Sequence, residues 1–436
     1  MKREGIEISL RDINRHHILR MALENKLTLS EAARTLGVSY RHAKRLKKAL
    51  MEEGIPGLQH GNRGRSPGNK TKEELKIRIV ALSNERYEDF NDTHFYEMLR
   101  DREEIHLSRE TVRAIRRSEG IKPKVKRKAR KHHKRRPRKL SEGLMMLWDG
   151  SPHRWFGAGT ESCCLMAAID DARGKALSMF FVKHECSWAY LELLRRVTST
   201  YGIPASVYQD RHSALKRNDD FWSIEEELAG RQDPTQVGVA LESLGIEPIF
   251  AITPQAKGRV ERLFETLQDR LVAMLRLEGI TDIERANAYI QEFFLDYFND
   301  KFAVEAENTQ SAWRKVPRNL DMERILSFRY EATVGNDNAI RFAGMIIDIE
   351  PGPSKRSYAG VRAELRQTLD GGWRVYYQDK LIATAPTTEV VEPFHTKNRK
   401  KGVRAAHDSK WVYLSSAQPR QNEVYGAKAQ TAKGTA

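Results

Sequence analysis

Cysteine is scarce in this chain of 436 residues, which has only Cys163, Cys164 and Cys186. Three thiols cannot form a disulfide framework, and their absence from the first 162 residues excludes cysteine-based zinc fingers there. Long apolar runs are also missing, since no stretch approaches the roughly 18 residues of a membrane-spanning helix. The start, residues 1–5, lacks the apolar core of a signal peptide. We therefore expect a soluble protein of a reducing, cytoplasmic compartment with buried, inert thiols.

Acidic residues are scarce toward both ends of the chain. Residues 1–140 hold 37 Lys and Arg against 19 Asp and Glu, a net charge of +18, and residues 396–436 carry +7. The middle, residues 141–395, is acidic with a net charge of −9. Polyanion-binding ends joined to a carboxylate-bearing, cation-binding middle would produce this segregation. The charge pattern predicts nucleic-acid binding, and the length predicts about three domains.

Residues 27–50 carry the pattern of two helices separated by a turn. Apolar residues repeat at helical spacing before Gly37, and Ser39 can cap a second helix. The second helix has a basic face suited to phosphates and base edges in a major groove. Its DNA-binding candidates are Arg41, Lys44, Arg45 and Lys48. We predict a helix-turn-helix domain over residues 1–60; the alternative is an ordinary helical hairpin with a solvated basic face.

A second helical unit is predicted over residues 61–120, after a connector rich in Gly, Arg and Pro. Arg63 and Arg65 in the connector could enter a minor groove. Helical patterns over residues 71–84, 90–102 and 107–117, the last capped by Ser108, resemble another helix-turn-helix. A purely structural helical pair is the alternative.

Residues 121–142, which we call the basic linker, carry 12 Lys or Arg and no acid up to Leu140. Such a run repels itself until phosphates neutralise it, so it is expected to follow a DNA backbone through residues such as Lys126 and Arg127. A solvated spacer is the alternative.

From residue 144 the chain changes to short apolar runs separated by turns. Runs at 144–149, 163–169, 176–182, 205–210 and 248–252 predict strands, and residues 188–201, 236–244 and 256–277 predict helices. This order describes a mixed sheet with helices on its faces over residues 143–305, within a multidomain α/β chain. Short β-rich runs in residues 320–395 predict a small SH3-like β-barrel. The basic, polar composition of residues 396–436 predicts a disordered tail.

Three acids fall where this sheet could bring them together. Asp149 and Asp210 are expected at the carboxyl ends of strands, where ligands of such sheets bind, and Glu261 lies in the first turns of the long helix. Three converging carboxylates repel one another unless cations compensate, which implies a hard divalent metal such as Mg²⁺. Two ions about 3.5 to 4 Å apart would activate an attacking oxygen and stabilise the leaving oxygen of a phosphoryl transfer.

Other charged residues around this triad have competing interpretations. Asp170 and Asp171 lie in a predicted turn, where Asp commonly bonds the local backbone, and Glu265 is one helical turn beyond Glu261. Any of them could replace a member of the triad. His212 could orient a water or a phosphate, or do neither. Lys257 and Arg259 crowd the start of the helix, where cations and N–H groups favour DNA phosphates.

Three sequence blocks together resemble a known family, the DDE transposases of the retroviral-integrase superfamily, specifically bacterial insertion-sequence transposases of the ISNCY type. The blocks are residues 147–152, 208–213 and 254–262, and the resemblance spans residues 20–395. It implies a ribonuclease-H-like catalytic core in which Asp149, Asp210 and Glu261 bind two Mg²⁺ or Mn²⁺ ions. The chain departs from retroviral integrases in an insertion over residues 216–234 and in lacking their zinc-binding front module.

The resemblance further implies an enzyme that nicks transposon ends and joins the 3′-hydroxyl to target DNA. Its expected partner is double-stranded DNA, and because two DNA ends must be handled together, we expect a homo-oligomer on DNA. We expect no membrane partner and a nucleoid-associated location in the bacterial cytoplasm. The alternative function is a noncatalytic DNA-binding regulator or architectural protein derived from a transposase. A structure-specific nuclease would explain the acids but not the two helical units. The intact triad favours the enzyme.

Overall fold

A computed structural model describes residues 9–59, 68, 70–124, 136–217, 222–251, 258–390, 393 and 412–414. The chain forms two compact units, Met1–Ile79 and Val80–Ala436, whose boundary falls within helix α4 (Glu73–Glu85). Within the described ranges, no helix combines the length and apolar character needed to cross a bilayer.

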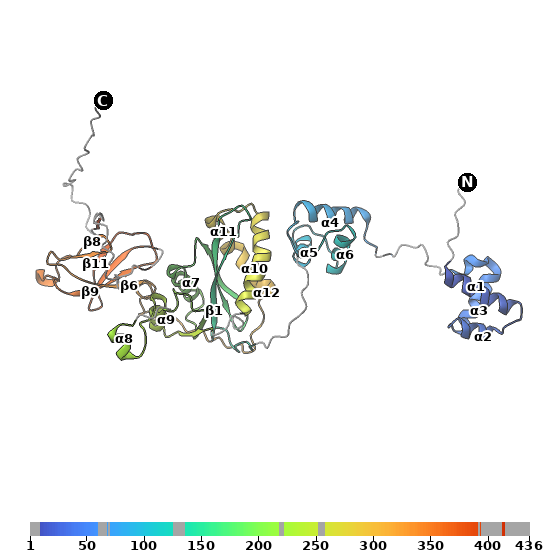
Figure 1. The fold of residues 1–436 in the computed structure, drawn as a ribbon, viewed down its shortest axis with the longest axis horizontal. Coiled ribbons are helices and arrows are strands. Elements are labelled where there is room, and N and C mark those ends of the chain that lie inside the picture. The colour runs from blue at the N-terminus through green and yellow to red at the C-terminus, as the bar shows by residue number, and fades with distance from the viewer. Residues whose placement is uncertain are drawn as a thin grey trace, which may run out of the picture. The chain divides into compact units, whose positions relative to one another are not determined.

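The first unit is a cluster of three helices, α1 (Leu10–Leu23), α2 (Leu29–Thr35) and α3 (Tyr40–Glu53), followed by the 3₁₀ turn η1 (Ile55–Leu58) (Figure 1). The predicted turn and cap are confirmed, since Gly37 has φ +62° and the Ser39 side chain accepts a hydrogen bond from the His42 backbone. The sequence patterns did not predict α1. It begins at a capping box formed by Ser9 and Asp12, and its Leu19 packs in the core against α3.

Three further helices follow, α4, α5 (Asp92–Asp101) and α6 (Arg109–Ser118). Ser108 caps α6 as predicted, and the Asn91 side chain caps α5. Val112 and Ile115 of α6 are buried.

The core of the second unit is a five-stranded mixed sheet in the order β3-β2-β1-β4-β5. Its strands are β1 (Met146–His153), β2 (Cys163–Asp170), β3 (Ala176–Val182), β4 (Ser206–Gln209) and β5 (Glu247–Phe250). The first three strands pair antiparallel, and β4 and β5 add parallel strands beside β1. The predicted mixed sheet is confirmed.

Helices cover both faces of this sheet. Figure 1 shows α7 (Ser187–Thr200) on one side of β1 and α10 (Gly258–Leu277) on the other. Helix α9 (Gln236–Ser243) packs beside α7, whereas α11 (Ile283–Tyr289), the π-helix η3 (Ile290–Phe294) and α12 (Leu295–Phe302) contact β3. The predicted insertion contains the short helix α8 (Ile224–Ala229).

Among its described residues, the C-terminal part holds α13 (Met322–Ile325), the 3₁₀ turn η4 (Pro353–Lys355) and seven strands in two sheets, ordered β11-β10-β9-β6 and β12-β8-β7. The strands are β6 (Phe328–Thr333), β7 (Ala339–Phe342), β8 (Met345–Asp348), β9 (Arg362–Gln367), β10 (Trp373–Tyr377), β11 (Lys380–Ala385) and β12 (Val412–Leu414). In the part of the chain that the structure describes, the two sheets do not close into one ring, so the expected SH3-like barrel is not confirmed.

Strand β12 corrects the prediction of a wholly disordered tail. Its three residues pair in parallel with β8, Val412 opposite Met345. They are β-prone residues within a polar, basic stretch, so the overall composition of the tail concealed a short strand.

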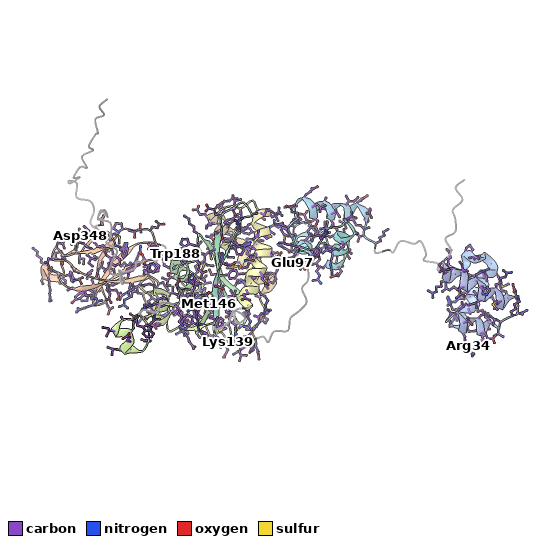
Figure 2. All side chains as sticks on the ribbon, viewed as in Figure 1. Arg34, Glu97, Lys139, Met146, Trp188 and Asp348 are labelled. Carbon is purple, nitrogen blue, oxygen red and sulfur yellow. The ribbon has the colours of Figure 1, made fainter. Side chains whose placement is uncertain are left out.

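One continuous apolar core connects the five-stranded sheet with the C-terminal sheets. It runs from Met146 and Trp148 of β1 through α7 to Phe328 and Trp373 of the C-terminal part. Trp188 of α7, marked in Figure 2, packs against this core and donates a hydrogen bond from its indole nitrogen to the Leu369 carbonyl at 2.9 Å.

Candidate catalytic and DNA-binding sites

The register of β1 and β4 indicates how Asp149 and Asp210 lie relative to each other. Strand β1 pairs with β2 along its whole length but with β4 only through Met146–Val207 and Leu147–Tyr208. Extending this parallel register by two residues places Asp149 beside Asp210, which directly follows β4. Because alternate residues of a strand share a face, both aspartates lie on the same face as the Leu147–Tyr208 pair.

Asp149 lies in the middle of its strand, which corrects the expectation that it ends one. Gly150, Ser151, Pro152 and His153 continue the pairing with β2. The apolar pattern breaks at Asp149 because β1 loses its neighbour β4 there and becomes more exposed, although the strand itself continues. Asp149 therefore lies on the part of β1 that extends past its pairing with β4.

The two aspartates are on the face of the sheet that α10 covers. On the opposite face, Trp148 packs against Tyr190 of α7 with ring centroids 5.2 Å apart. Ser151, two residues beyond Asp149, instead accepts a hydrogen bond from the Gln268 amide of α10 at 3.2 Å. This alternation directs the Asp149 side chain toward the α10 side.

Glu261 lies in the first turn of α10 and is exposed. Gln268 follows it by seven residues and Glu265 by four, so the three share one face of the helix. The structure nevertheless leaves the triad open: within the described residues, no three His, Cys, Asp or Glu side chains form a group that could hold a metal ion. Residues 252–257, including the candidate Lys257, lie outside the described residues.

A fourth carboxylate, Glu185, which the sequence patterns did not mark, lies beside Tyr190 and His212. The Tyr190 hydroxyl donates to Glu185 Oε1 at 2.5 Å, and His212 Nδ1 lies 3.7 Å from the same oxygen. The His212 backbone N–H donates to Asp210 Oδ1 at 2.8 Å. Burial, together with the charges of Glu185 and Asp149, raises the pKa of Tyr190 well above 10. An acid just before a helix is usually explained by its favourable interaction with the helix N-terminus. The local sequence therefore did not indicate Glu185 as a functional residue.

Gly150 gives Glu185 the room to lie beside β1. A Cβ atom at this position would lie 2.6 Å from Glu185 Oε2 and 2.9 Å from Cys164 Sγ. Any larger residue after Asp149 would therefore displace the carboxylate or the strand.

The two turn acids that competed for a metal role make internal contacts. Asp170 is buried and accepts hydrogen bonds from the backbone N–H groups of Gly143 at 2.9 Å and Arg173 at 2.8 Å. Asp171 is buried as well and binds Arg136 and Arg259. The local bond of Asp170 to Arg173 is the kind expected for an acid in a turn, whereas Asp171 binds residues distant in sequence.

The basic face of α3 is the clearest DNA-binding candidate in the first unit. Arg41, Lys44, Arg45 and Lys48 are all exposed, and their spacing of three and four residues places them along one side of the helix. Among the four, Lys48 has a loose pair with Glu52 at 3.6 Å. The other candidates Arg63, Arg65, Lys126 and Arg127 lie outside the described residues.

Arg259 has internal contacts that the sequence did not indicate. It pairs with Asp171 and donates a hydrogen bond to the Arg136 carbonyl at 2.6 Å. In both of these contacts the Arg259 guanidinium binds other residues of the protein, which the prediction of a DNA contact did not include.

The chain resembles known transposases over most of its length, and the homeodomain-like domain family matches residues 9–59. A relative from Sinorhizobium fredii, named "Putative transposase y4bF", is 33% identical over 399 residues, covering 88% of this chain and 85% of that protein. The transposase for insertion sequence IS1202 from Streptococcus pneumoniae is 30% identical over 418 residues, covering 86% of each.

Among solved structures, the catalytic core domain of HTLV-2 integrase in complex with magnesium matches with a TM-score of 0.26 and 17% identity, over 39% of this chain and 94% of that chain. The simian T-cell lymphotropic virus intasome in complex with a PP2A regulatory subunit matches with a TM-score of 0.29 and 14% identity, over 73% and 100%. Both structural likenesses are weak. The two sequence relatives, each aligned over most of both chains, show that this chain belongs to the insertion-sequence transposases.

Proposed function

We propose that this transposase binds the ends of its element and catalyses divalent-metal-dependent cleavage and strand transfer of DNA through Asp149, Asp210 and Glu261. The proposal rests above all on the parallel register of β1 and β4, which, continued by two residues, would set Asp149 beside Asp210. Oxygen donors on two rigid strands are of the kind that hard divalent cations take. The DNA-transposase relatives support the same reaction class.

The donor chemistry fits Mg²⁺ or Mn²⁺, with two ions in the proposed site. Asp149 and Asp210 would hold the metal, and Glu261 would complete the set from α10. Bound metal would supply the positive charge that activates an attacking oxygen and stabilises a leaving oxygen. Because no complete group exists among the described acids and histidines, the proposal requires the exposed Glu261 side chain to turn toward the aspartates in the assembled complex.

Backbone hydrogen bonds orient the two aspartates. The Gly150 N–H donates to Asp149 Oδ1 at 3.1 Å, and the His212 N–H donates to Asp210 Oδ1 at 2.8 Å. Each bond restricts rotation of one carboxylate, so the pair is aligned before DNA binds.

The exposed basic face of α3 would hold the DNA ends, and the basic linker would follow the backbone. Phosphate contacts of this kind fix register and make binding strongly salt-dependent. Cleavage and joining at two ends would require two or more copies of the chain on DNA, so we propose a homo-oligomer as the active form.

A noncatalytic DNA-binding role is the second candidate, and the incomplete triad is the observation that favours it. A strand-transfer assay separates the two functions. Labelled DNA carrying the element's terminal repeats is incubated with the full chain in Mg²⁺ or in Ca²⁺, and Asp149→Asn serves as the comparison.

The proposed function predicts Mg²⁺-dependent cleaved and joined products that Asp149→Asn abolishes while DNA binding remains. Binding without cleavage or joining by the wild type, with the correct ends supplied, would favour the noncatalytic role.

A further inference from the structure

Asp171 is a fully buried acid that lies directly after β2. Arg136 donates to both of its carboxylate oxygens, from Nη2 at 2.6 Å and from Nη1 at 3.2 Å. The backbone N–H of Lys139, labelled in Figure 2, donates to Oδ2 at 2.8 Å. Arg259 of α10 pairs with Oδ1. One buried carboxylate thus joins the end of the basic linker to the helix that carries Glu261.

One further contact ties the linker directly to α10, and another ties the linker to the turn after β2. The Arg259 Nη2 donates to the Arg136 carbonyl at 2.6 Å, and Arg138 donates to the Ala172 carbonyl at 3.1 Å. The linker and the start of α10 therefore meet twice, once through Asp171 and once directly. A shift of either segment would break several charge-assisted hydrogen bonds together.

The same cluster also abuts both aspartate-bearing strands. The Arg136 guanidinium lies over the Tyr208 ring, 5.8 Å from its centroid, and Tyr208 precedes Asp210 by two residues. The Asp171 backbone N–H donates to the Met145 carbonyl at 3.0 Å, just before β1 begins. The cluster is thus anchored to β1 and β4.

Asp171 carries the charge that holds this cluster. Burial raises the pKa of its carboxyl, but hydrogen bonds from Arg136 and Lys139 outweigh burial, and the pKa is below its usual value of 3.8. The ionised form is therefore present at neutral pH. Neutralising it would leave two arginines without their shared anionic partner.

We propose that Asp171 is a positioning residue that fixes the first turn of α10, and with it Glu261, relative to the end of the basic linker. It acts through Arg259, which precedes Glu261 by two residues on α10. The inference rests on the proposed function, because that function gives Glu261 its role. Residues that orient a metal ligand commonly change metal affinity or activity by about 10- to 100-fold when they are replaced.

The test compares the full chain with Asp171→Asn and Arg259→Gln, first without metal or DNA. Hydrogen exchange of the amides in residues 258–265 reports on the start of α10 directly. The inference predicts faster exchange there in both variants. In strand transfer, both should need about 10- to 100-fold more Mg²⁺ for half-maximal joining, with unchanged binding to DNA ends.

Glu192→Gln is the matched control. Glu192 is also a buried carboxylate that binds two arginines, Arg195 and Arg196, at 2.6 and 2.7 Å, but it lies on α7, across the sheet from α10. It should leave exchange at residues 258–265 and the Mg²⁺ dependence at wild-type values. If Asp171→Asn does not fold, Arg259→Gln carries the test, since it leaves the Asp171–Arg136 pair in place.

Wild-type exchange and Mg²⁺ dependence in Asp171→Asn or Arg259→Gln would overturn the inference and leave the proposed function standing. Equal changes in Glu192→Gln would overturn it too, because they would reflect a general loss of stability. If the wild type joins no DNA, the proposed function fails, while the exchange measurement still decides whether Asp171 holds α10.

Discussion

The three thiols lie in the core of the second unit, where Cys163 and Cys164 are on β2 and Cys186 precedes α7. Burial, with the charge of Glu185 next, raises the pKa of Cys164 to about 12, and burial also raises the pKa of Cys163. A raised pKa removes the reactive thiolate at neutral pH. The sequence prediction of buried thiols is confirmed.

We therefore expect all three cysteines of the native protein to resist iodoacetamide at pH 8 and to react fully in urea. Mass spectrometry of the alkylated protein measures this directly. Rapid labelling of Cys164 in native protein would contradict the account of its buried environment.

Single residues differ in how far the sequence could predict them. Asp149 and Asp210 were selected because a motif marked them, and strand register then brought them together. The roles of Glu185 and Asp171 depend on partners 27 and 35 residues away, His212 and Arg136. No periodicity records such long-range pairs, so the sequence could name these acids only as members of a turn or a helix start.

Among the elements, those with local signals were predicted well. The helices after Ser39 and Ser108 begin where the caps predicted, because a capping side chain and the following helix are neighbours in sequence. Helix α1 was missed although Ser9 and Asp12 form a local capping box, whereas β12 was missed because it depends on pairing with the distant β8. The sequence also could not predict whether the C-terminal strands close into a barrel. Turn signals indicate which strands are neighbours along the chain, but not whether the first and last strands of a sheet pair with each other.

The basic face of helix α3 is expected to bind DNA phosphates, and a single substitution on it tests this. Lys44→Ala removes one exposed cation from its basic face and should leave the helix folded, because Lys44 makes no core contact. We expect weaker binding to DNA ends and a slope of log affinity against log salt reduced by about one. Fluorescence anisotropy at several salt concentrations measures both.

Arg20→Ala is the control for this prediction. Arg20 is an exposed cation on α1 that pairs with Glu24 at 2.9 Å. An unchanged salt slope in Lys44→Ala, or an equal loss in Arg20→Ala, would contradict α3 as the DNA-binding helix.

At the scale of the whole molecule, ion pairs join α5 to the core. Arg270 of α10 binds both oxygens of Glu97, labelled in Figure 2, at 2.6 and 3.1 Å, and Lys301 of α12 contacts Glu97 at 3.4 Å. Arg270 is buried and lies over the Phe302 ring. The helix that carries Glu261 is therefore held by the sheet on one side and by α5 on another.

Breaking the buried pair should loosen this docking. Arg270→Met leaves Glu97 without its main partner, which we expect to cost about 3 kcal/mol, so amides of α5 should exchange roughly 100-fold faster. Arg276→Ala is the matched control, since its pair with Asp89 is more exposed and is worth less than about 1 kcal/mol. Equal exchange in the two variants would contradict a buried ionic anchor.

The central claim is that Glu261 completes a catalytic set with Asp149 and Asp210, and its most direct test compares Glu261→Gln with Glu265→Gln. Both glutamates are exposed and lie one turn apart on α10, so the two substitutions are alike in everything but position. In strand transfer with Mg²⁺ and the element's own ends, Glu261→Gln should give no joined product, whereas Glu265→Gln should join DNA as the wild type does. Joining by Glu261→Gln at the wild-type rate, or its loss only in Glu265→Gln, would contradict the account.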